Sequence, residues 1–149
     1  MSTLIIEKAK LKNLKDLIYL LFDDDLGKDR ENISETSFNN YKKSFMKILN
    51  DSNNEIFTMI LNDQIIGMMQ LTFIPGLSME GMSRCQIESV RIKKDYRNKG
   101  YGSELIKKGI EIAKLNKCGL IQLTSNKERL KAINFCLLYT SDAADERLR

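Results

Sequence analysis

A basic segment followed by two glycines has the residue types and spacing best suited to bind a phosphate group. Positions 91–99 carry five basic residues against the single acid Asp95; they are Arg91, Lys93, Lys94, Arg97 and Lys99. Gly100 and Gly102 follow where the apolar spacing changes from that of a strand to that of a helix. The first N–H groups of a helix lack partners within it, and glycine lets an anion approach them. The spacing therefore predicts an anion-binding turn, with a solvated basic loop as the alternative.

Two widespread phosphate motifs do not match this turn. The P-loop requires GxxxxGK followed by Ser or Thr, and the sequence contains no such run. The dinucleotide-binding fingerprint requires a third glycine three residues after the second, where Leu105 stands. The turn therefore does not favour ATP or NAD as its ligand.

The composition excludes several kinds of catalytic site. The chain has 149 residues and no histidine, which rules out Ser–His and Cys–His nucleophile pairs and any zinc site that uses histidine. Three cysteines, Cys85, Cys118 and Cys136, are widely spaced and form no CxxC motif, as is typical of buried thiols in a reducing compartment. No apolar run approaches the ~18 residues of a membrane span. We expect one cytoplasmic globular domain without a metal site.

The hydrophobic spacing predicts a mixed α/β fold. Strands are expected at 4–6, 56–61, 64–74, 86–92 and 120–124, and helices at 11–22, 35–49, 102–113 and 129–135. The order is β-α-α-β-β-β-α-β-α. Three consecutive strands favour antiparallel pairing, whereas the strand–helix–strand unit over 86–124 requires a right-handed parallel crossover.

The spacing Arg97-x-x-Gly100-x-Gly102, between a strand and a helix, resembles the acetyl-CoA pyrophosphate loop of the GCN5-related N-acetyltransferase (GNAT) superfamily. A Glu-x-Val-x-Ile strand at 88–92 precedes the loop, and Ala132-x-x-Phe135 follows where that superfamily has its next helix. The resemblance extends over positions 4–135. It implies a GNAT-like mixed sheet with helices on both faces, and acetyl-CoA as cosubstrate.

The resemblance also implies which residues bind the cosubstrate. Backbone groups of Val90 and Ile92, on the strand that includes Arg91, would pair with the pantetheine arm as if it were an added strand. The pyrophosphate would be bound by the turn residues Arg97, Asn98, Lys99, Gly100, Tyr101, Gly102 and Ser103. Asn126 would contact the far side of the cosubstrate. A backbone N–H near Val90 would stabilise the thioester oxygen as it gains negative charge.

Glu88 is the candidate general base that removes a proton from the attacking amine. Strict alternation places it on the face of Val90 and Ile92, the expected buried side, where desolvation would raise its pKa. A bulge, which this strand often has in the superfamily, would change that face. The alternative roles for Glu88 are to bind the substrate ammonium or to order a water molecule.

The resemblance breaks down after Phe135. The superfamily continues with a tyrosine, commonly the acid that protonates the leaving thiolate, and then with two closing strands; Cys136 stands at the tyrosine position. Positions 137–149 are too few for two strands of about 5–6 residues each that also fill a core layer. We therefore expect an incomplete acetyltransferase domain at 1–136 and an atypical polar tail at 137–149. The strand edge left open would favour dimerisation.

Three functions are compatible with these features. The first is an N-acetyltransferase that moves an acetyl group from acetyl-CoA to a primary amine of a small molecule or peptide by direct attack. The second is a CoA-binding module without turnover, because the closing strands are missing. The third, a nucleic-acid binder, is disfavoured because Tyr96 and Tyr101 are the only aromatic residues within the basic segment. We expect no nucleic-acid or membrane partner.

Overall fold

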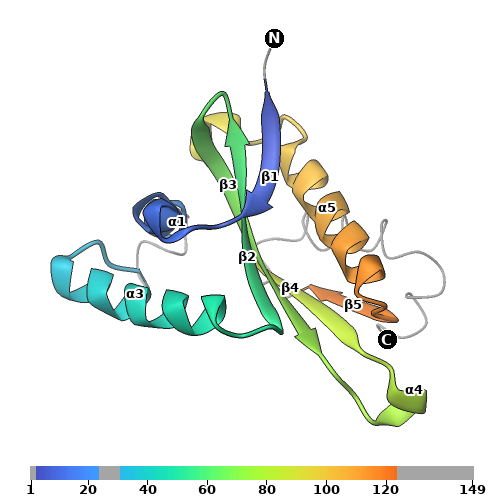
Figure 1. The fold of residues 1–149 in the computed structure, drawn as a ribbon. Coiled ribbons are helices and arrows are strands. Elements are labelled where there is room, and N and C mark those ends of the chain that lie inside the picture. Colours follow the sequence, from blue (N-terminus) through green and yellow to red (C-terminus); the bar gives the residue numbers. More distant parts are fainter. Residues whose placement is uncertain (1–2, 24–30, 124–149) are drawn as a thin grey trace.

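The computed structural model describes residues 3–23 and 31–123 (Figure 1). The first half comprises β1 (Leu4–Lys8), the 3-10 helix η1 (Leu11–Asn13), α1 (Leu14–Phe22), α3 (Glu35–Leu49) and β2 (Asn54–Leu61). The second half comprises β3 (Gln64–Ile74), the short helix α4 (Ser78–Gly81), β4 (Arg84–Ile92), the 3-10 helix η2 (Lys94–Tyr96), α5 (Tyr101–Leu115) and β5 (Leu120–Leu123). The expected order is confirmed as far as β5. Asn126, the helix expected at 129–135 and the tail at 137–149 lie outside the described residues.

The five described strands form one mixed sheet in the order β1-β2-β3-β4-β5. The first four pair antiparallel, while β4 and β5 pair in parallel from Arg84 opposite Leu120 to Ile87 opposite Leu123. A parallel pair needs a crossover, and α5 supplies it, as expected. Asn62 and Asp63 form the β2–β3 turn with φ of 48° and 68°, the conformation of the two-residue hairpin turn that their types predict.

Helices cover both faces of the sheet, so the core has two parts. Figure 1 shows α5 on one side of the sheet and α1 and α3 on the other. The larger part joins α5 to β2–β5 and includes Met59, Met69, Leu71, Ile87, Leu105 and Ala113. The smaller part joins α1 and α3 to the opposite face and includes Leu17, Ile18, Phe45 and Met68. Because both faces are covered, β3 is almost continuously apolar instead of alternating.

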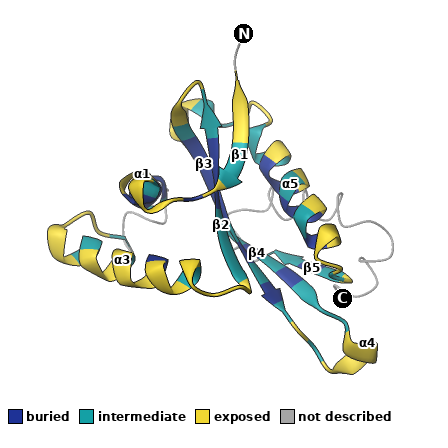
Figure 2. Cartoon of the chain, in the orientation of Figure 1, coloured by how far each residue is buried: buried dark blue, intermediate teal, exposed yellow. Residues whose placement is uncertain are grey.

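The helix α3 is held to the protein along a narrow stripe. Phe45 is its only fully buried residue, and Figure 2 shows most of the helix surface exposed. At its N-terminus the Ser34 hydroxyl accepts a hydrogen bond from the Ser37 N–H at 3.3 Å, a side-chain cap that stabilises the first turn.

Among the described residues no helix is both long and apolar enough to cross a membrane, and no group of His, Cys, Asp or Glu is suited to hold a metal ion.

Gly109 lets α5 approach the sheet closely. A Cβ atom at this position would lie 3.2 Å from Ile87 Cδ1 and 3.3 Å from Met69 Sδ. We predict that Gly109→Leu lowers the free energy of unfolding by about 1–3 kcal/mol through overpacking. The exposed Lys114→Leu on the same helix is the control and should change it by less than about 1 kcal/mol. Urea denaturation measures both, and equal effects would contradict the close approach.

Candidate functional site

The turn between β4 and α5 presents an uncapped helix N-terminus. Gly100 is the N-cap residue with φ 88° and ψ 1°, and no side chain makes a capping hydrogen bond there. Asn98 also has a positive φ of 62°. The Glu104 N–H donates to the Gly100 carbonyl at 3.2 Å, so regular helical bonding begins only at Glu104. The N–H groups that precede it, from Tyr101 to Ser103, are the donors expected to face an anion.

The space around these donors is open, which is the condition for a bulky anion such as a pyrophosphate. A Cβ atom placed on Gly100 would meet no atom within 4 Å. One placed on Gly102 would meet only Ile92 Cγ1, at an ordinary contact distance of 3.9 Å. Among the described residues, no atom therefore closely crowds the side of the turn to which the two glycines face. The binding of the pyrophosphate at this turn stays a prediction.

Arg97 connects the start of the turn to the end of β4. Its Nε–H donates to the Ile92 carbonyl at 2.9 Å, so part of the guanidinium makes a structural bond. A guanidinium carries five N–H donors, and the remaining ones are suited to an anion. The sequence predicts the anion-binding role of Arg97 but not its structural one. No sequence pattern indicates a hydrogen bond from this side chain to a backbone carbonyl five residues earlier.

Two tyrosines support the turn from the core side. The rings of Tyr96 and Tyr101 contact edge to face with 6.2 Å between centroids, and both pack against the larger core cluster. Lys99 Nζ lies 5.9 Å from the centre of the Tyr96 ring, within the range of a cation–π interaction. The Tyr96 hydroxyl reaches Gln64 Oε1 at 3.4 Å. These rings therefore stabilise the turn.

The β4 backbone expected to meet the pantetheine arm already has hydrogen-bond partners. The Val90 carbonyl accepts from Arg91 Nη1 at 3.0 Å, and the Ile92 carbonyl accepts from Arg97. A carbonyl oxygen has two lone pairs, so an added strand would share these oxygens with the arginines or displace them. Arg91 therefore lies in β4 and bonds to the strand's own backbone, and its part in binding the cosubstrate stays a prediction.

The face predicted for Glu88 is wrong, because β4 has a bulge at Ser89. Ser89 has a φ of 54°, and the pairing with β3 shifts between Arg91 opposite Met68 and Glu88 opposite Gln70. One extra residue reverses the alternation. Val90 and Ile92 consequently pack with Ile87 against α5. Glu88 follows its partner Gln70 to the face covered by α1 and α3, where it is half-buried.

The described cysteines are not nucleophiles. Burial, with smaller effects from the nearby Cys118 and Glu55, raises the pKa of Cys85 to about 12. Burial also raises the pKa of Cys118, which is only half-buried. Both thiols are therefore protonated at neutral pH, and thiolate is the reactive form. The expectation of buried thiols is confirmed for Cys85, and Cys136 lies outside the described residues.

The two glycines of the turn should respond differently to substitution. Gly100→Ala places a side chain in the left-handed region, and we predict a loss of about 1–2 kcal/mol in unfolding free energy. Gly102→Ala meets only an ordinary contact and replaces a helical glycine, so stability should be unchanged or rise by up to about 1 kcal/mol. Chemical denaturation of the pair tests this; an equal loss in both would contradict the open space at Gly102.

Solved structures resemble this fold over most of the chain. A transcriptional regulator from Bacillus halodurans C-125 is 36% identical, with a TM-score of 0.87 and 95% of each chain covered. A GNAT family acetyltransferase from Staphylococcus aureus is 25% identical, with a TM-score of 0.70, over 85% of this chain and 89% of that one. A predicted acetyltransferase from Clostridium acetobutylicum, solved with acetyl-CoA, is 16% identical and shares the fold, with a TM-score of 0.72 over 94% and 91%.

The family model agrees with these structural likenesses. No curated protein matches the chain significantly. The model of the acetyltransferase (GNAT) family matches residues 14–137, which include α1, the whole described sheet from β2 onward and the glycine turn. The family uses acetyl-CoA as cosubstrate. The chain belongs to the GNAT acetyltransferase family and is an acyltransferase.

Proposed function

We propose that this protein is an N-acetyltransferase that transfers the acetyl group of acetyl-CoA to a primary amine by direct attack. The observation that carries the proposal is the uncapped first turn of α5, where the described residues leave space beside Gly100 and Gly102. In a GNAT fold this is where a pyrophosphate would meet backbone N–H groups and the positive end of the helix dipole.

The cosubstrate supplies an activated acetyl group when it is bound. Arg97, Lys99 and the N–H groups of 98–103 would hold its phosphates, and the backbone of 90–92 would position the pantetheine arm. The two arginine bonds to β4 carbonyls would keep that strand edge in an extended conformation before binding. The contact expected from Asn126 belongs to the same proposal.

Direct attack is supported by the lack of an activated nucleophile among residues 3–23 and 31–123. The sequence has no histidine to activate a serine or cysteine, and the raised pKa values keep Cys85 and Cys118 protonated. A covalent acyl-enzyme requires a thiolate or an activated hydroxyl. The amine therefore attacks the thioester itself, and a carboxylate suffices to take up its proton.

Glu88 remains the candidate for that carboxylate on its corrected face. It lies next to the bulge residue Ser89, on the side of the sheet that α1 and α3 cover. The bulge thus places the residues proposed to position the cosubstrate and the proposed base on different faces of β4. Val90 and Ile92 contact the α5 core, while Glu88 faces the other side. A base on the side opposite α5 can meet an acceptor that enters between α1, α3 and the sheet.

Binding of nucleic acid is not part of the proposal, although one similar structure is named a transcriptional regulator. Bases bound as single strands stack on exposed aromatic rings. Tyr96 and Tyr101 instead pack against each other and the core.

Binding of the cosubstrate is tested with Gly102→Asp. An acid in the first helical turn suits the helix dipole, so the variant should fold, but its carboxylate repels phosphate at the same N–H groups. At a ligand concentration 100 times Kd, acetyl-CoA stabilises a protein by about 2.7 kcal/mol. We expect acetyl-CoA to raise the Tm of the wild type and of Lys114→Asp, which places the same charge at the exposed far end of α5, and to raise that of Gly102→Asp little or not at all. Equal Tm increases in all three proteins would contradict the binding site.

The role of Glu88 is tested with Glu88→Gln. Loss of a general base lowers kcat by about 10²–10⁴-fold, and the KM for acetyl-CoA should change little. Release of free CoA thiol, measured with and without amine, gives both constants. Glu80→Gln, at the exposed tip of the β3–β4 hairpin, is the matched control and should behave like the wild type. Acetyl-CoA binding without amine-dependent thiol release would support the binding module without turnover.

A further inference from the structure

A pocket opens on the sheet face opposite α5, directly at the bulge. It has a volume of about 160 Å³ and lies between α1, α3 and the sheet. Ser89 from the bulge and Gln70, which pairs with Glu88, form its β-sheet wall. The bulge therefore has two effects: it places Glu88 on the face opposite α5, and it brings Ser89 to the edge of this pocket.

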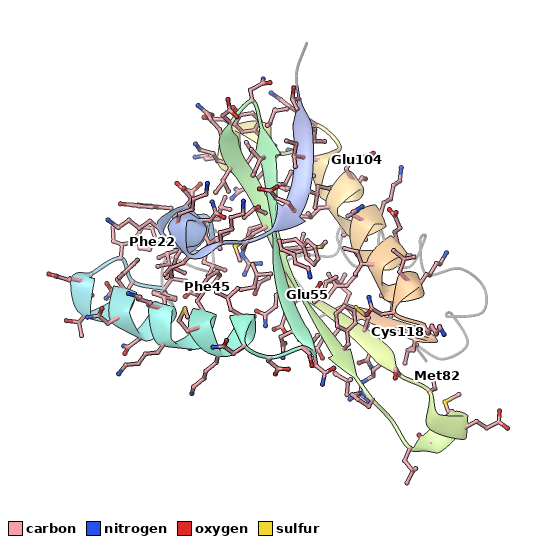
Figure 3. All side chains as sticks on the ribbon, viewed as in Figure 1. Phe22, Phe45, Glu55, Met82, Glu104 and Cys118 are labelled. Atoms are coloured by element: carbon pink, nitrogen blue, oxygen red, sulfur yellow. The ribbon has the colours of Figure 1, made fainter. Side chains whose placement is uncertain are left out.

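The pocket wall is uncharged and mostly apolar. Side chains from α1, α3, β2 and β3, among them Leu17, Phe45 and Met68, form most of it. Figure 3 shows Phe45 in the space between α3 and the sheet. The polar lining groups are neutral: Ser44, Gln70, Ser89 and Tyr41. Burial, and a hydrogen bond to Glu31 Oε1 at 2.6 Å, raise the pKa of Tyr41 and keep its hydroxyl neutral.

The size and chemistry of the pocket limit what can fill it. A cavity of about 150 Å³ lined by aliphatic and aromatic side chains binds benzene and excludes water. The pocket at Ser89 has nearly this volume but opens to solvent, and eight of its twelve lining residues are apolar, so a phenyl ring or a branched alkyl group can enter it and contact apolar side chains. A charged group there would lose part of its hydration and would find no ionic partner in the described wall. The pocket therefore selects for an apolar group and against a charged one.

A larger cavity on the same side of the sheet has a different character. It has a volume of about 470 Å³ and is lined by α1 and by residues 32–38, with Lys15 and Glu35 bringing charges of both signs. No residue of β4 lines it, in contrast to the pocket at Ser89. An acceptor held there would not be positioned by the bulge, and for this reason the smaller pocket is the better site for the acceptor.

We infer that the acceptor is a primary amine carrying a compact apolar group, aromatic or branched alkyl, which fills the pocket at Ser89 while the amine lies beside β4 and Glu88. This inference rests on the proposed acetyl transfer. In that reaction the amine lone pair forms a C–N bond to the acetyl carbon and the C–S bond breaks. The nitrogen loses one proton and the CoA thiolate gains one.

A matched pair of amines tests the substrate class. Phenethylamine and ethylamine differ by the phenyl ring, and even a single methylene in an apolar pocket changes kcat/KM by about 10–200-fold. We expect kcat/KM, measured by CoA thiol release, to be at least tenfold higher for phenethylamine than for ethylamine, spermidine or kanamycin. Equal values for the first two amines, or a preference for spermidine or kanamycin, would overturn the inference. Acetyl-CoA that neither binds nor releases CoA with any amine would instead reject the proposed function.

Filling the pocket tests its location. Ser44 is exposed at the pocket rim on α3, so Ser44→Leu should fold while occupying the space of the ring. Asn39→Leu makes the same kind of change on an exposed part of α3 that does not line the pocket. We expect the phenethylamine-to-ethylamine ratio of kcat/KM to fall at least tenfold in Ser44→Leu and to remain unchanged in Asn39→Leu.

A binding measurement keeps the inference testable without turnover. Phenethylamine alone should raise the Tm of the wild type and of Asn39→Leu, but not that of Ser44→Leu. Circular dichroism and the acetyl-CoA-induced Tm increase check that both variants are folded. An identical response of the two leucine variants to phenethylamine would show that the ring binds elsewhere and would overturn the inference.

Discussion

The parallel pairing of β4 with β5 is the constraint on which the candidate site depends. Parallel neighbours cannot be joined by a tight turn, so the chain must cross the sheet before it can pair again. The crossover is α5, and its N-terminus is therefore placed just beyond the end of β4. The unpaired N–H groups of the helix and the edge of β4 come together for this reason. An extended molecule with a pyrophosphate can use both at once.

The bulge at Ser89 determines which residues of β4 face α5 and which face α1 and α3. Residues on either side of it, Ile87 and Val90, pack into the same core beneath α5, which a regular strand would not allow. The residues displaced by the bulge turn to the side covered by α1 and α3. The proposed cosubstrate and acceptor sites thus meet at one strand without competing for the same surface. A direct transfer between two bound substrates requires such an arrangement.

The proposed cosubstrate site and the proposed acceptor pocket differ in charge. The turn at the N-terminus of α5 combines backbone N–H groups with basic side chains, and Arg97 and Arg91 also bond to the backbone of β4. The pocket on the opposite face has no charged residue in its described wall. The phosphates of the cosubstrate and the apolar group of the amine would therefore be directed to different parts of the surface around β4, while the thioester and the amine nitrogen meet at the strand.

The sequence by itself determined the order of the elements as far as β5, the mixed sheet and the glycine turn at the start of α5. These depend on local properties: apolar periodicity, a glycine at a helix start, and the need for a crossover. Only the tertiary structure decided the face of Glu88, the bonds of the two arginines to β4 carbonyls and the pocket at Ser89. Nothing in the neighbouring sequence indicates the positive φ of Ser89. The pocket joins side chains from α1, α3 and three strands, and only their packing brings them together.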